Sequence, residues 1–259
     1  MPYIKEVCRA GKTIEVGKYY SSRYGIKGIK RSANHAPTPE QMQRANERAA
    51  TKKLRRIINT NFGLGDIHLV LTYRRDLTPT PDEARKHLER FLRKARGYYA
   101  QAYGRDLKYI TVTEYKRARV HHHLILPSLS MTELYGLWQH GRPHITPLDA
   151  TGQYGQLAEY LIKETAKTFA EDSSPYKKRW NQSKNMIPPT VKKEIIQANS
   201  WRKKPKAIAG YYVDKDSVCN GECEGNGCAY QFYTMIMLGQ KARGGEVIDK
   251  KRAVSAVLA

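Results

Sequence analysis

Two apolar runs separated by only "KRAR" constrain the fold of this chain more than any other feature of its sequence. The first run is "LKYITVTEY" (107–115), and the second is "VHHHLILP" (120–127). Both are rich in β-branched and aromatic residues, and so short a connection is typical of a β-hairpin. We therefore expect the two runs to pair as antiparallel strands of one sheet.

The segments around this hairpin alternate between strand and helix patterns. Further strands are predicted at 66–73 ("DIHLVLTY"), at 143–148 and at 230–238. Helices are predicted after the capping residues Thr38 and Ser130, and over 79–104 and 155–170, where apolar residues recur with helical spacing. This order predicts an α+β protein, in which helices pack on a single central antiparallel sheet.

Composition divides the chain into three parts. Most of the predicted elements lie in 60–170, which we expect to form the core domain. Residues 1–59 are predicted to be a basic N-terminal extension, irregular up to residue 37 and then forming one helix. Residues 171–259 are predicted to be a basic C-terminal extension with a late strand and a cysteine-containing loop, packed on the core.

The charge of the chain predicts a polyanionic partner. The 259 residues include 46 Lys and Arg against 24 Asp and Glu, which gives a formal net charge of +22. Such an excess is typical of nucleic-acid-binding proteins. The 18 tyrosines against 4 phenylalanines favour the same partner, because tyrosine stacks on bases and tolerates a wet groove. A non-catalytic, ribosome-like binding protein would explain the charge equally well.

Targeting signals and cysteine usage favour a reduced, cytoplasmic protein. The N-terminus has no apolar segment suited to a signal peptide, and no stretch approaches the ~18 apolar residues of a membrane span. The four cysteines, Cys8, Cys219, Cys223 and Cys228, are too few for a disulfide scaffold. They could form a zinc site only with irregular ligand spacing, so a reduced, glycine-rich loop around the last three is the simpler interpretation.

The three histidines at the start of 120–127 are candidate metal ligands. Side chains alternate along a strand, so His121 and His123 share one face and His122 lies on the other. Pairing of the two strands would bring Glu114 beside His121 or His123. Two imidazoles and one carboxylate leave coordination positions open, as a catalytic metal requires. The alternative is a run of surface histidines with incidental metal affinity.

A tyrosine in "EYLIKE" (159–164) is a candidate nucleophile. Tyr160 and Lys163 stand one helical turn apart, and a nearby cation favours the phenolate. The pattern is common, and an exposed Tyr and Lys on an amphipathic helix would explain it as well. Tyr154 is a rival nucleophile, but it falls on another face of the helix.

The ordered set of these motifs resembles the HUH endonucleases. More closely, it is similar to the single-tyrosine rolling-circle replication initiators of phages, plasmids and integrative elements. Their three motifs correspond to "HLVLTY" (68–73), "HHH" (121–123) and "YLIK" (160–163). The resemblance covers about 60–170. His122 stands where the family has a hydrophobic residue, on the face away from the metal.

The resemblance implies a metal-assisted tyrosine transesterification on single-stranded or hairpin origin DNA. It implies that His121, His123 and Glu114 bind Mg²⁺ or Mn²⁺, that Tyr160 attacks the phosphate, and that Lys163 assists. Attack leaves a 5′-phosphotyrosine link and a free 3′-OH, and the strand can later be rejoined. These roles place the protein in the cytoplasm of a bacterial host.

Further partners and alternatives follow from the same resemblance. We expect phosphate contacts from Arg74, Arg75 and Lys167. "AGKT" (10–13) lacks the first glycine of a phosphate-binding loop, so a host helicase is implied, and a host polymerase would extend the 3′-OH. A related relaxase or single-strand transposase stays open. Relaxases of this type usually carry a wider-spaced three-histidine cluster, and small transposases are much shorter.

Overall fold

The computed structural model describes residues 3–22, 24–25, 38–115, 119–169, 178–198, 200–223 and 227–239, without the side chains of 166–169. In chain order the elements are β1 (Tyr3–Ala10), β2 (Thr13–Tyr20), α1 (Pro39–Asn61), β3 (Ile67–Thr72), α2 (Pro81–Tyr103), β4 (Ile110–Glu114), β5 (His121–Leu126), α3 (Met131–Leu137), β6 (Pro143–Pro147), α4 (Gly155–Phe169), β7 (Asn181–Gln182), β8 (Thr190–Ile196), β9 (Tyr211–Glu222) and β10 (Ala229–Met237). The α+β prediction is confirmed.

The predicted hairpin lies near the middle of an antiparallel sheet with strand order β6-β3-β5-β4-β7, here called the central sheet. Strands β4 and β5 pair antiparallel, so that Glu114 stands opposite His121 and Val112 stands opposite His123. The other neighbour of β5 is β3, where Val70 stands opposite His123. The register therefore places the predicted acidic ligand on the strand beside the histidines.

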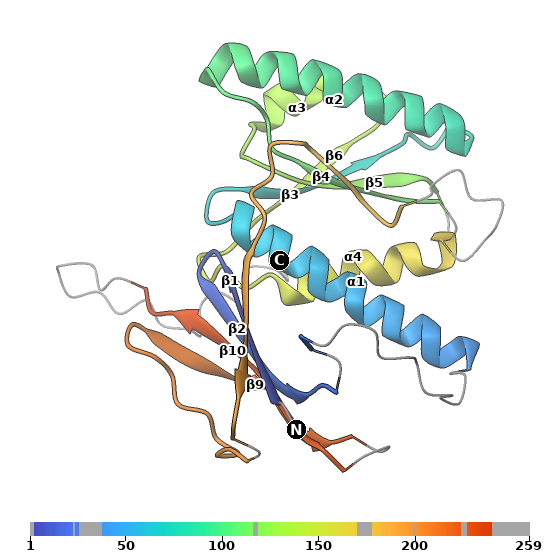
Figure 1. The fold of residues 1–259 in the computed structure, drawn as a ribbon. Coiled ribbons are helices and arrows are strands. Elements are labelled where there is room, and N and C mark those ends of the chain that lie inside the picture. Colours follow the sequence, from blue (N-terminus) through green and yellow to red (C-terminus); the bar gives the residue numbers. More distant parts are fainter. Residues whose placement is uncertain are drawn as a thin grey trace.

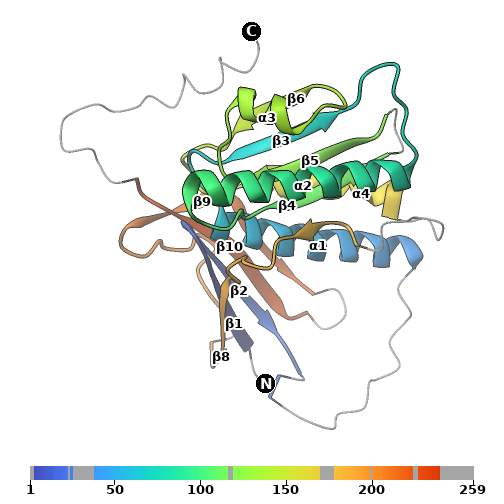
Figure 2. The ribbon, with the colours of Figure 1, turned by 90° about the horizontal axis from the view of Figure 1, so that it is seen from above.

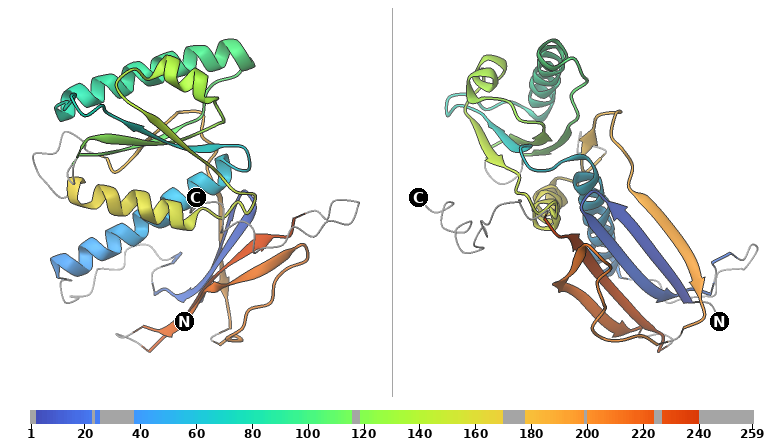
Figure 3. Two further views of the ribbon diagram at one scale, coloured as in Figure 1. Left: turned by 180° about the vertical axis from the view of Figure 1, so that it is seen from behind. Right: turned by 90° about the vertical axis from the view of Figure 1, so that its left-hand side faces the viewer.

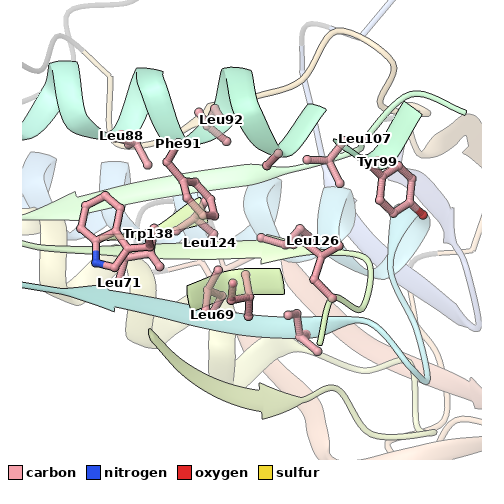
Figure 4. Packing of buried hydrophobic residues seen from close by; sticks show 14 of the residues in the cluster. Leu69, Leu71, Leu88, Phe91, Leu92, Tyr99, Leu107, Leu124, Leu126 and Trp138 are labelled. Carbon is pink, nitrogen blue, oxygen red and sulfur yellow. The ribbon is translucent and has the colours of Figure 1, made fainter. Parts of the chain in front are cut away.

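Helices α2 and α3 cover one face of the central sheet (Figures 1 and 2). Each begins with a capping box, in which Thr80 or Ser130 exchanges hydrogen bonds with the residue three positions later. Apolar side chains from the sheet and from α2 interdigitate beneath the helix (Figure 4). Leu71, Phe91 and Trp138 are almost fully buried there. Close packing on this face leaves the opposite face of β5 for His121 and His123.

Helices α1 and α4 lie side by side against the opposite face of the central sheet (Figure 1). The predicted capping box of Thr38 and Gln41 begins α1. Near its end, Leu54 and Ile58 pack in one buried cluster with Leu161 and Ile162 of α4 and with residues of β4 and β5. This packing fixes which side of α4 faces the sheet. None of the helices in the described ranges is long and apolar enough to cross a membrane.

A second antiparallel sheet was not predicted. Its strand order is β8-β1-β2-β10-β9, and we call it the terminal sheet. It packs on the other side of α1 from the central sheet (Figure 3). The prediction that residues up to 37 are irregular is therefore wrong for residues 3–20, and the prediction of a single sheet is incomplete.

The turn between β1 and β2 explains how this hairpin docks on α1. Gly11 adopts a positive φ of 56°, and a Cβ at this position would lie 1.9 Å from the carbonyl oxygen of Asn59. The Asn59 amide also donates to Thr13 Oγ1 at 3.1 Å. Only glycine can thus bring the turn this close to the end of α1.

Ion pairs join α1 to the terminal sheet. Arg56 donates to Glu15 Oε2 at 2.7 Å and to Glu6 Oε1 at 2.9 Å. Arg55 lies 2.7 Å from Glu15, and Lys52 lies 3.3 Å from Glu6. Since both carboxylates are almost buried, these pairs hold the helix and the sheet in one arrangement.

We expect Glu6→Gln to destabilise the protein in a pH-dependent way. Burial alone would raise the pKa of Glu6, but Arg56, Lys52 and Lys193 lower it to about 2. The folded pKa lies below the ordinary value of 4.5, so the charged form stabilises the fold above pH 4.5 and loses this effect as the pH falls toward 2. The substitution should lower the free energy of unfolding by about 3 kcal/mol at pH 7.

Urea unfolding monitored by circular dichroism measures this difference. The gap between wild type and Glu6→Gln should narrow from pH 4.5 downward. Glu194→Gln is the matched control, because Glu194 forms an exposed pair with Lys5 on the neighbouring strand and should have no measurable effect. A difference in the free energy of unfolding that stays constant with pH would contradict the stabilising role of charged Glu6.

Candidate metal and tyrosine site

The register of β4 and β5 gathers three side chains that could hold a metal ion. Glu114, His121 and His123 each offer one ligand atom, and these atoms all lie within 4.8 Å of one another. His121 Nε2 lies 3.0 Å from Glu114 Oε2. No other group of this kind occurs in the described part of the chain, where Cys8 is buried and Cys219 and Cys223 are exposed.

The surroundings of His123 fit a bound cation. The side chain is buried, and among the described residues its Nε2 has no hydrogen-bond partner. Burial, followed by the neighbouring His68, His121 and His122, lowers the pKa of His123 to about 3. The ring is therefore neutral at physiological pH, as a metal ligand must be. Two imidazole nitrogens and a carboxylate oxygen suit a divalent ion with open positions.

His122 belongs to the other side of the sheet, as its position in the strand predicted. It is fully buried among the residues beneath α2 and α3. Its Nε2 lies 3.1 Å from the Tyr73 hydroxyl, and its Nδ1 lies 2.9 Å from Thr113 Oγ1. These two hydrogen bonds satisfy the ring inside an apolar core. The three consecutive histidines thus divide into two candidate ligands and one core residue.

Tyr160 stands over the candidate metal ligands. Its ring centroid lies 5.4 Å from that of His123, with an interplanar angle of 86°. The residue is 43% exposed, whereas the next residue, Leu161, is buried and anchors α4. Burial, then the charges of Glu164 and Glu114, raise the pKa of the Tyr160 phenol.

Tyr154, the rival nucleophile, is buried just before α4 begins. Its hydroxyl donates to the Asp149 carbonyl oxygen at 2.8 Å. Burial and the charge of Asp149 raise its pKa to about 12. The environment of Tyr154 is that of a packed structural residue.

Lys163 does not pair with Tyr160 in this structure. Its Nζ lies 2.8 Å from Glu159 Oε1, and this hydrogen bond raises the pKa of the ammonium. We expected Lys163 to lower the pKa of Tyr160, but burial, Glu164 and Glu114 set that pKa in this structure, and they raise it. Lys163 and Glu159 both line a cleft between α1, α4 and the terminal sheet, and none of the three candidate metal ligands lines it.

The expected phosphate contacts are described only in part. Arg74 and Arg75 follow β3 and are exposed, beside a hollow that Tyr135 and Arg142 also line. Arg74 lies 3.6 Å from Asp76. The Lys167 side chain lies outside the described residues.

Sequence reasoning missed His68, the first residue of "HLVLTY". Its Nε2 lies 3.1 Å from His123 Nδ1, and the two rings stack with centroids 5.3 Å apart. The alternation of β3 was the available signal, because Leu69 and Leu71 face the core and so turn His68 toward the opposite face. If His123 binds a metal through Nε2, its Nδ1–H donates to His68 and fixes the orientation of the ring.

We expect His68 to set the metal affinity of His123. His68→Leu removes the acceptor and should weaken Mn²⁺ binding by about 10–100-fold, as is usual when the partner of a ligand histidine is lost. His68→Gln keeps an acceptor oxygen and should retain more of the affinity. Isothermal titration calorimetry with Mn²⁺ measures both variants. Equal affinities for wild type and His68→Leu would rule out this role.

The fold and the site define an α+β protein with a candidate metal group and an exposed tyrosine on one face of an antiparallel sheet. Residues 66–168 match the family model of the replication-associated protein ORF2/G2P. The matched region contains Glu114, His121, His123 and Tyr160. No curated protein and no solved structure gave a significant match. The family match associates this part of the chain with DNA replication and is consistent with a rolling-circle replication initiator.

Proposed function

We propose that the protein is a rolling-circle replication initiator that nicks single-stranded or hairpin origin DNA by tyrosine transesterification. The observation that carries the proposal is the position of Tyr160, whose ring stands over His123 beside the buried Glu114. A non-catalytic binding protein would leave this arrangement without a purpose. The family match to replication-associated proteins supports the same role.

The proposed reaction exchanges one phosphodiester bond for another. The Tyr160 oxygen attacks the scissile phosphorus, a Tyr–O–P bond forms, and the bond from phosphorus to the 3′ oxygen breaks. The phenolic proton is lost to solvent or to a nearby base, and the departing 3′ oxygen takes up a proton to become the 3′-OH. The phosphotyrosine stays on the 5′ end of the downstream fragment, so a later 3′-OH can reverse the reaction without an added energy source.

His121, His123 and Glu114 would hold the divalent ion, Mg²⁺ or Mn²⁺. When bound, the ion would supply Lewis-acid polarisation of the scissile phosphate. Glu114 contributes a charge that raises the pKa of Tyr160, so neutralising this carboxylate favours the phenolate. Lys163 would assist after exchanging Glu159 for a phosphate oxygen.

Binding would draw on the positive charge of the whole chain. Arg74 and Arg75 are proposed phosphate contacts on the edge of the central sheet, and Lys167 is proposed to serve the same purpose on α4. The free 3′-OH would prime a host polymerase, and a host helicase would open the duplex ahead of it. These roles place the protein in a bacterial host cell.

A covalent-capture experiment tests the proposal on DNA of many sequences at once, so that the origin itself need not be supplied. A single-stranded DNA library with a randomised segment is incubated with the protein and Mn²⁺, and adducts that survive denaturation are isolated and sequenced. We expect the protein on the 5′ end of the downstream fragment, and a free 3′-OH on the upstream one. DNA binding without any adduct would favour the non-catalytic alternative.

A further inference from the structure

A cleft of about 810 Å³ lies between the terminal sheet and the paired helices α1 and α4. It is separate from the candidate metal group, which lies on β4 and β5 of the central sheet, and none of the three candidate ligands lines it. Arg44 and Arg48 line it from α1, Phe232 and Tyr230 line it from β10, and Lys163 lines it from α4. Figure 3 shows the two helices between the two sheets that form its surroundings.

The cleft is positively charged. Six Lys or Arg side chains line it against three carboxylates. Glu15 is already paired with two of the arginines at its base. Arg44 and Arg48 are exposed, and no carboxylate of the described residues lies within 4.0 Å of either. These two arginines, one helical turn apart, present their charge to the opening of the cleft.

Aromatic rings form the floor of the cleft on the terminal sheet. Phe232 is 37% exposed. It stacks on Tyr19 with centroids 6.2 Å apart, and it lies 5.7 Å from Tyr230. Lys52 stands over the Phe232 ring, 6.0 Å from its centroid. A Cβ on Gly17 would lie 2.8 Å from the same ring. A larger residue at position 17 would therefore clash with Phe232 in this position.

Helix α4 connects the cleft to the candidate nucleophile. Glu159 and Lys163 line the cleft, whereas Tyr160, on the neighbouring side of the helix, faces His123. Three residues advance a helix by about 4.5 Å. A strand bound at Tyr160 thus needs to cross only one turn of α4 to reach Lys163 and the cleft.

We propose that this cleft binds the single-stranded DNA that flanks the scissile phosphate. The phosphates would lie along Arg44, Arg48 and Lys163, and bases would stack on Phe232 and Tyr230. A cationic wall opposite stacking rings is the combination that binds single strands without reading their sequence. The proposal rests on the proposed function only in taking DNA as the substrate, and binding in the cleft needs neither metal nor chemistry.

The test measures binding alone, on the full chain carrying Tyr160→Phe and in the presence of EDTA. The probe is fluorescent oligo(dT) of about 20 nucleotides, longer than the roughly 4–16 nucleotides that one single-strand module covers. Fluorescence anisotropy over a series of salt concentrations gives the affinity and its salt slope. Phe232→Leu should weaken binding about tenfold, because a base loses its stacking partner.

Arg44→Gln/Arg48→Gln should weaken binding and reduce the salt slope by about 1.4, since each single-strand phosphate contact contributes roughly 0.7. Lys86→Gln/Arg93→Gln is the matched control, because it removes two exposed charges from α2 on the far side of the central sheet. Thermal melting of each variant establishes that it is folded. Variants of the cleft that bind like the control variant would overturn the proposal.

Photo-crosslinking gives a second, independent result. Oligonucleotides containing 5-iododeoxyuridine should crosslink to the β10 peptide that carries Phe232 and Tyr230, and crosslinks confined to other peptides would contradict the cleft. Since no step requires catalysis, the two proposals can fail separately. If the wild-type protein formed no adduct in the covalent-capture experiment but the cleft variants still lost DNA binding, the proposed binding site would stand and the proposed nuclease activity would be refuted.

Discussion

Tyr160→Phe is expected to abolish the covalent protein–DNA adduct while leaving the fold, metal binding and DNA binding unchanged. Phenylalanine keeps the ring that packs against His123 and removes only the attacking oxygen. Without the attacking oxygen, the rate should fall by at least about 10³-fold, the scale seen when a catalytic nucleophile is removed. A denaturing gel with 3′-labelled DNA selected from the library measures the adduct directly.

Tyr154→Phe is the matched control for this experiment. The Tyr154 hydroxyl is engaged with the Asp149 carbonyl oxygen, so its loss should reduce stability slightly and leave the adduct intact. Mass spectrometry of the nuclease-trimmed adduct identifies the modified residue. A nucleotide on any residue other than Tyr160 would refute the nucleophile assignment, even if the protein nicks DNA.

The second large effect is expected from His121→Ala/His123→Ala. The double variant removes two of the three candidate ligand atoms, including His121 Nε2, which lies 3.0 Å from Glu114 Oε2. One carboxylate cannot retain a divalent ion with useful affinity, so both Mn²⁺ binding and nicking should fall below detection. Calorimetry measures the metal, and a gel of labelled DNA measures the nick.

Measuring the DNA affinity of the double variant distinguishes the loss of the metal from a loss of the fold. The double variant should bind oligo(dT) within about threefold of wild type, because phosphate contacts come from the spread positive charge. Nicking that persists in a folded double variant would show that the metal site is assigned incorrectly. Glu114→Gln keeps the shape of the site and should weaken metal binding without unfolding the hairpin.

The central sheet and the candidate ligands could be predicted because local patterns determine them. The short connection between 107–115 and 120–127 fixes the direction of pairing, and strand alternation separates His122 from His121 and His123. Glu114 was then the one acidic residue able to reach the pair. The structure places it opposite His121.

The terminal sheet could not be predicted because its partners are distant in sequence. Strand β2 pairs with β10, for example Ile14 with Met235. On the α1 side of β1 and β2, Glu6 and Glu15 interrupt the apolar alternation, and their counter-ions come from α1. The role of His68 was not predicted for a related reason, because its partner, His123, is on β5, which follows α2 and β4 in the chain. The charged cleft depends on both of these long-range arrangements.

The pairing of β2 with β10 also orders the events of biosynthesis. The central sheet and its four helices need residues only up to 182, so they can fold while the ribosome is still making the rest of the chain. The terminal sheet is complete only when β10 pairs with β2, and contacts of such wide sequence separation form slowly. A nascent chain would therefore carry the tyrosine and its histidines before it could hold a DNA strand in the cleft.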